Sequence, residues 1–183
     1  MLSHFNDIEN RIKWFEFYSE TFNWNDYNFY RNYNHFNFDF INEFKLKINW
    51  GILFAVKTFP ESFINKYIKY YTKHIWYNIS CHQKLSESFI EKFKDKVDWV
   101  TISAFQKLSE SFIEKFKDNV SWYDISCHQK LSESFIEKFK DKVDWQLILQ
   151  SQILSKQFIQ KMIKNNIISS QMVSIYCKNK FTF

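Results

Sequence analysis

A twelve-residue segment, KLSESFIEKFKD, occurs three times in this chain, beginning at Lys84, Lys107 and Lys130, always 23 residues apart. The similarity extends outward, because residues 83–99 and 129–145 are identical to one another. A fixed period of this length is typical of a stack of structural units, each of which buries its apolar face against its neighbours. We therefore expect a repeat architecture.

Weaker copies flank the exact ones. Trp50 precedes Phe63-Ile64 by the same 13 residues that separate Trp76 from Phe89-Ile90, and the period is broken by three extra residues near 67–74. We count about six or seven units with degenerate ends, as in capped arrays. The expected organisation is an N-terminal cap rich in aromatic residues and asparagine (1–39), a repeat array (40–164) and a C-terminal cap (165–183).

Composition favours helices. The chain of 183 residues has a hydrophobic fraction of 45%, but only one glycine, Gly51, and one proline, Pro60. Hairpin turns and phosphate-binding loops need residues that tolerate positive φ, so this composition leaves almost no material for a hairpin-rich sheet or for such a loop. The three cysteines, the absence of an apolar N-terminal leader and the short apolar runs predict an intracellular chain without a membrane span.

The second helix of each unit is expected at about residues 86–94. Ser86 is a favourable N-cap residue, since its hydroxyl can accept a backbone N–H of the first turn. Phe89, Ile90 and Phe93 then form one apolar stripe. Equivalent helices are expected near 109–117 and 132–140.

The first helix of each unit is expected near 99–106, with copies near 76–83 and 122–129. Asp98 can cap this helix, and one of its faces carries Trp99, Ile102, Ser103 and Gln106. The small Ser103 would allow a neighbouring helix to approach closely. Helices this short are unstable alone, so they must pack on one another.

These patterns predict an all-α fold, an α-solenoid of short helix pairs with about 23 residues per repeat. A unit of one helix and one extended or 3₁₀ segment is the alternative. Residues 99–106 lack the alternation of a strand, which favours the helix pair. Trp99 and Phe112 are expected to be nearly buried, and a final helix over about 166–177 should close the core.

Two adjacent pairs, Cys81-His82 and Cys127-His128, raise the possibility of a zinc site. They lie two units apart, about 20 Å at the usual helix spacing, and Ala104-Phe105 occupies the same positions between them. A variable, partly buried position explains them better. No catalytic, cofactor-binding or metal-binding residue is predicted, and the recurring tryptophans are expected in the core rather than in a ligand-stacking ladder.

The net charge of +5 arises after Trp145, where five lysines have no acidic residue near them in sequence: Lys156, Lys161, Lys164, Lys178 and Lys180. Two interpretations remain open, a solvated capping region or a docking surface for an acidic partner. The repeat itself is neutral, which disfavours a nucleic-acid code of one base per unit.

The unit W-x-x-I-S-x-x-Q-K-L-S-E-S-F-I-E-K-F-K-D-K-V-D-W resembles tandem repeats in proteins of giant DNA viruses of amoebae, most closely over 76–145. The resemblance implies a viral protein with a repeat architecture, located in the host cytoplasm or the virion, and no catalytic residue. We expect a non-enzymatic scaffold that binds an unidentified host or viral protein as an adaptor or structural component. The alternatives are association with nucleic acid through the basic C-terminal region, or self-assembly into the virion; the oligomeric state is open.

Overall fold

The computed structural model describes residues 23–32 and 38–177, and it is helical throughout that part of the chain. The described residues contain thirteen α-helices, one 3₁₀ turn and no strand. The predicted all-α repeat solenoid is confirmed. Most of residues 1–39, together with Lys178 and Lys180, lie outside the described residues. No helix in the described ranges is both long enough and apolar enough to cross a membrane.

The chain divides into two compact units, Met1–Asn78 and Ile79–Phe183. The helices of the first unit are α2 (Tyr27–Asn32), α3 (Phe38–Phe44), α4 (Trp50–Val56) and α5 (Glu61–Lys66), followed by the 3₁₀ turn η1 (Ile68–Tyr70) and by α6 (Lys73–His82), which spans the division.

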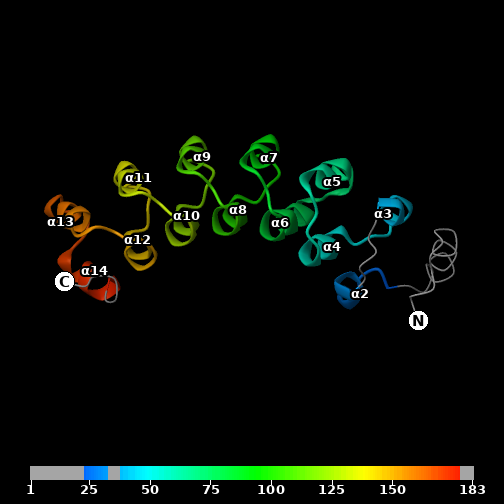
Figure 1. Cartoon of the computed structure of the whole chain (residues 1–183), viewed down its shortest axis with the longest axis horizontal. Coiled ribbons are helices and arrows are strands. Elements are labelled where there is room, and N and C mark those ends of the chain that lie inside the picture. Colours follow the sequence, from blue (N-terminus) through cyan, green and yellow to red (C-terminus); the bar gives the residue numbers. More distant parts are fainter. Residues whose placement is uncertain (1–22, 33–37, 178–183) are drawn as a thin grey trace. The chain divides into compact units, whose positions relative to one another are not determined.

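The second unit is a double row of helices (Figure 1). The outer row comprises α7 (Glu87–Lys92), α9 (Glu110–Lys115), α11 (Glu133–Lys138) and α13 (Lys156–Lys164). The inner row comprises α8 (Trp99–Phe105), α10 (Trp122–His128), α12 (Trp145–Ser151) and α14 (Ser170–Tyr176). Consecutive inner helices pack directly on one another. This unit curves, and the inner row lies on the inside of the curve (Figure 1).

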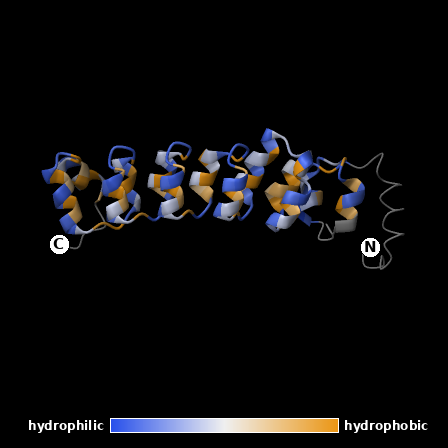
Figure 2. Ribbon diagram, turned by 90° about the horizontal axis from the view of Figure 1, so that it is seen from above, coloured by the Kyte–Doolittle hydropathy of each residue, from blue (hydrophilic) through white to orange (hydrophobic). Residues whose placement is uncertain are grey.

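The helices alternate as the sequence predicts. Ser86 caps α7 by accepting the N–H of Phe89 (3.2 Å), and Asp98 caps α8 by accepting that of Thr101 (2.9 Å). The outer helices are shorter than expected because the chain turns at Phe93, whose carbonyl accepts the N–H groups of residues 96 and 97. Each described helix of the double row carries both apolar and polar residues (Figure 2), as short helices that pack on one side require.

Burial of the two predicted core residues differs. Phe112 is 4% exposed, as predicted, but the expectation that Trp99 is nearly buried is wrong, since that residue is only half-buried. Its ring packs against Phe112 and Phe116, with centroids 6.4 and 5.0 Å away, while its indole N–H donates to the Lys94 carbonyl in a surface turn (2.9 Å). The Trp99 ring therefore lies at the edge of the core and joins it to the turn that contains Lys94.

The final described helix begins later than predicted. Asn166 has φ of 57°, and the N–H groups of Asn166 and Ile167 donate to the carbonyls of Ile163 and Met162 (both 3.0 Å). This is a Schellman motif, which ends α13. Because residues 165–168 are used for that turn, α14 starts only after Ser169, whose hydroxyl caps it.

Candidate functional site

A ladder of buried glutamines joins the inner helices of the second unit. The side chain of Gln106 accepts the N–H of Leu85 (3.0 Å) and donates to the carbonyls of Ser80 and Gln83 (both 2.8 Å). These bonds connect the amide to the repeat before its own. Because a buried amide is costly unless its groups are paired, the ladder fixes how neighbouring repeats align.

The same bonds recur one repeat later. Gln129 binds Leu108, Ser103 and Gln106 at 3.1, 2.8 and 2.8 Å, and Gln152 follows with Leu131, Ser126 and Gln129. The sequence analysis placed glutamine on this helix face but missed its bonds to the preceding repeat. The available signal was a glutamine recurring at period 23 beside apolar core positions.

Ser103 is a second buried polar link. Its hydroxyl donates to the carbonyl of Trp99 (2.7 Å) and accepts the N–H of Ser121 (3.0 Å), the residue that caps the next inner helix. Ser80 and Ser126 accept from the backbone of Asp98 and Asp144 in the same way. A small polar residue at this position lets the inner helices approach each other and also pairs a backbone donor.

The outer helices are linked through carboxylates. Glu87 accepts the N–H of Ser109 (2.6 Å), and Glu91 pairs with Lys115 (2.5 Å). The next repeats copy both contacts, with Glu110 and Glu133 bound to Ser132 and Ser155, and Glu114 and Glu137 paired with Lys138 and Lys161. The constant residues of the repeat thus hold one unit to the next.

The residues that differ between repeats lie mainly among the constant residues of the first helix of each repeat. Aligning residues 76–98, 99–121 and 122–144 shows six variable positions, four of which fall between the constant residues of W-x-x-I-S-x-x-Q. The third position of this motif is buried at Thr101 and half-buried at Asp124. In these three repeats the second and seventh positions are exposed, and the sixth is half-buried. We define the variable face as these residues in the second unit: Cys81, His82, Val100, Ala104, Phe105, Tyr123, Cys127, His128, Gln146, Gln150 and Ser151.

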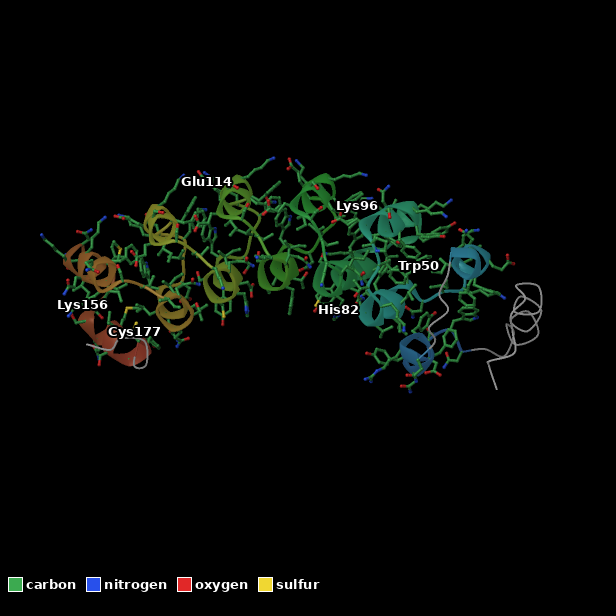
Figure 3. The ribbon with its side chains drawn as sticks, in the orientation of Figure 1. Trp50, His82, Lys96, Glu114, Lys156 and Cys177 are labelled. Carbon is green, nitrogen blue, oxygen red and sulfur yellow. The ribbon has the colours of Figure 1, made fainter. Side chains whose placement is uncertain are left out.

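The residues of the variable face include no lysine, arginine, aspartate or glutamate, and the half-buried Asp124 is the one charged residue among the variable positions of these helices. The variable face exposes large apolar or aromatic side chains, namely Val100 at 58%, Phe105 at 63% and Tyr123 at 62%. The charged residues that hold the outer row lie elsewhere, as Glu114 shows, on the side opposite His82 (Figure 3). A surface of this kind can pack against apolar groups and offer hydrogen bonds, but it has no fixed charge to pair with a ligand.

The two Cys-His pairs lie on this face. Cys81 and Cys127 are half-buried on different helices, while His82 and His128 are exposed. Over residues 23–32 and 38–177, no three His, Cys, Asp or Glu side chains gather as metal ligands. Burial raises the pKa of the Cys81 thiol, and the Asp98 carboxylate raises it further. The thiol is thus held neutral, the form that does not bind metals well.

Three of the five predicted contact lysines, Lys156, Lys161 and Lys164, lie on α13. Lys161 pairs with Glu137 of the preceding outer helix (2.6 Å), so an acidic residue that is distant in sequence is its partner. Lys156 and Lys164 are exposed at the first and last positions of α13, and Lys178 and Lys180 lie outside the described residues. A partner contact through these lysines stays a prediction.

The regular contacts between repeats change at α13 and α14. Lys156 and Gln160 stand where the earlier outer helices have the two linking glutamates. Ser170 replaces the tryptophan of α14, and Cys177 replaces the ladder glutamine, donating to the Leu149 carbonyl at 3.5 Å. α13 is therefore bonded to α11, but it lacks the two glutamates that would bond a following outer helix.

Comparison with known proteins found no matching family model, no matching curated protein and no matching solved structure.

Proposed function

We propose that this chain is a non-enzymatic repeat scaffold that binds a protein partner through the variable face. The observation that carries the proposal is the separation of constant and variable residues within nearly identical repeats. The constant residues bond one repeat to the next, whereas four of the six variable positions lie on helices such as α8 and α10, in the row on the inside of the curve. Curved solenoids commonly bind ligands along that side.

Exposure alone does not account for this distribution. Lys94, Lys117 and Lys140 are exposed in the outer-row turns, yet they are the same in all three repeats. The corresponding exposed residues of the inner row, such as His82 and Phe105, differ. Selection on the chemistry of one face explains why the differences are concentrated there.

The alternatives have less support. The variable face offers no cation for a phosphate, and Lys161 is already paired, which weakens the nucleic-acid hypothesis. Replacement of the linking glutamates by Lys156 and Gln160 works against stacking of further copies on α13. The resemblance to repeats of giant viruses supports a role as a viral adaptor or structural protein in the host cytoplasm or virion.

Selection from a displayed library of random peptides on the full-length protein tests the proposal. We expect enriched peptides whose binding is lost in Phe105→Ser and in Tyr123→Ser. Lys117→Ser, an exposed outer-row change, is the matched control and should bind normally. Circular dichroism should show unchanged helix content in all three variants. Failure to enrich any peptide that depends on Phe105 or Tyr123 would refute the proposal.

A further inference from the structure

The variable face presents its side chains at a regular interval. One line contains Val100, Tyr123 and Gln146, on α8, α10 and α12. A second line contains His82 at the end of α6, followed by Phe105, His128 and Ser151 on the same three inner helices. The inner helices pack directly on one another, and packed helices lie about 8–10 Å apart. A ligand that lies along the row must therefore offer equivalent groups at about that spacing.

The two common extended conformations differ in this respect. In a β-strand, side chains return to the same side every second residue, at roughly 6.6 Å. In a polyproline II helix, they return every third residue, at roughly 9.3 Å. Only the second interval agrees with the spacing of packed helices. A polyproline II segment can thus present one side chain to each repeat without losing register.

The chemistry of the face fits such a segment. Phe105 and Tyr123 are exposed rings, against which proline and aliphatic side chains can pack. A polyproline II backbone has no internal hydrogen bonds, so its carbonyls can accept from the Tyr123 hydroxyl or the His128 imidazole. Because the residues of the face carry no charge, neither the face nor an uncharged ligand loses the hydration of an ion when they bind.

We propose that the variable face binds an uncharged, proline-containing segment of a partner protein in the polyproline II conformation, with three ligand residues per repeat. The segment places apolar side chains opposite Val100 and Phe105 and polar ones opposite Gln146. This inference rests on the proposed function, because it specifies the ligand of the same surface.

Synthetic peptides test the three-residue register. Peptides of ~12 residues would extend ~37 Å as polyproline II, enough to cross about four inner helices. One peptide carries leucine at every third position of a proline-rich frame. A second has the same composition with leucine at every second position where possible, and a third has it in scrambled order. Each is fluorescently labelled and titrated with the full-length protein while anisotropy is recorded.

We expect the peptide with leucine at every third position to bind about tenfold more tightly than the others, and Phe105→Ser and Tyr123→Ser each to weaken it about tenfold, as loss of a central aromatic contact commonly does. Lys117→Ser should leave its affinity unchanged. Equal binding of the three peptides, or binding unaffected by both face variants, would overturn the proposal.

The two proposals can fail separately. If display-selected peptides bind through Phe105 and Tyr123 but the three-residue series has no advantage, the register is wrong and the scaffold function stands. If neither kind of peptide depends on these residues, both proposals are wrong. Binding of single-stranded DNA that is lost in Phe105→Ser, with no peptide bound, would also overturn both.

Discussion

The first and second units share one feature and differ in most of what surrounds it. In each, a tryptophan opens a helix and its indole N–H donates to the carbonyl five residues earlier, from Trp50 to Lys45 (3.1 Å) and from Trp99 to Lys94 (2.9 Å). Yet Trp50 is 5% exposed, whereas Trp99 is half-buried. The same local motif therefore lies at different depths.

The polar links of the second unit are absent from the equivalent positions of α4. The residues that stand in place of Ser103, Gln106 and Ser109 are Phe54, Lys57 and Pro60. Phe54 is fully buried, and the Lys57 ammonium donates to the Arg31 carbonyl (3.0 Å). The first unit thus replaces buried hydrogen bonds with aromatic packing.

The three-residue insertion accounts for the depth of Trp50. The 3₁₀ turn Ile68–Tyr70 follows α5, and the rings of Tyr67, Tyr70 and Tyr71 lie 5.2, 6.1 and 5.5 Å from that of Trp50. Tyr67 has a counterpart in Phe116, which lies 5.0 Å from Trp99, but no aromatic residue corresponds to Tyr70 or Tyr71 after α7, α9 or α11. The depth of the tryptophan depends on the residues that pack over it, so the motif alone does not determine it.

The largest expected effect separates Trp50 from Trp122, the half-buried equivalent of Trp99 in the next repeat. Trp50→Ala should lower the free energy of unfolding by about 3–5 kcal/mol because a fully packed ring is removed. Trp122→Ala, at a half-buried position, should cost about half as much. Native-state hydrogen exchange of amides in α4 and α10 measures each unit by itself. Equal losses would show that ring burial does not distinguish the units.

The next test breaks the glutamine ladder. Gln106→Ala leaves the Leu85 N–H and the Ser80 and Gln83 carbonyls without this partner, which should cost about 3 kcal/mol. Gln146→Ala, at an exposed position, is the control and should change stability by less than about 0.5 kcal/mol. Urea unfolding followed by circular dichroism measures both. A loss for Gln106→Ala no larger than for the control would mean that the ladder contributes little.

High pH should weaken the first unit. Burial raises the pKa of Tyr30 from 10.0 to about 12, although the N–H of Asn49, which the hydroxyl accepts, partly opposes the shift. Because the folded state retains the proton more tightly, this stabilisation is complete below pH 10 and is lost as the pH rises towards 12. The loss is about 2 kcal/mol.

Tyr30→Phe removes the titrating group and is the comparison for the pH experiment. Its first unit starts less stable, because the hydroxyl also donates to the Trp24 carbonyl (3.0 Å). Its stability should, however, fall less between pH 9 and 12 than that of the unmodified protein, as urea midpoints would show. Parallel decreases in the two proteins would exclude Tyr30 as the cause.

The smallest expected effect concerns the ion pairs of the outer row. Glu114 pairs with Lys138, and the equivalent position of the first unit is Asn65. Because both partners are substantially exposed, Glu114→Gln should cost less than about 1 kcal/mol, and the difference should shrink in ~1 M salt. Asp141→Asn controls for the change of net charge. A cost that is independent of salt would indicate a role other than ion pairing.

Local signals allowed much of the helical structure to be predicted. The caps at Ser86 and Asp98 depend on residues within one turn, and the period repeats them. The start of α14 was misjudged because Asn166 adopts positive φ, a conformation that hydrophobicity does not report. Local sequence was thus sufficient where the determinants are local.

Features that depend on distant residues were harder to predict. The burial of Trp50 requires Tyr70 and Tyr71, some 20 residues later, and the amide of Gln106 bonds to a carbonyl 26 residues earlier. The variable positions were visible in the sequence, but which of them are exposed on the inner helices was not. That exposure requires knowing which helix face packs against the neighbours.

The glutamine ladder has a consequence for how this gene can change length. Each glutamine of the ladder makes the same hydrogen bonds to the repeat before it. It can therefore pair with any repeat that supplies a serine carbonyl, a glutamine carbonyl and a leucine N–H at the equivalent positions. Unequal recombination within the repeated DNA would add or remove whole repeats without creating an unpaired buried amide. Internal repeats are therefore interchangeable, and the variable face can lengthen or shorten without a new kind of contact between repeats.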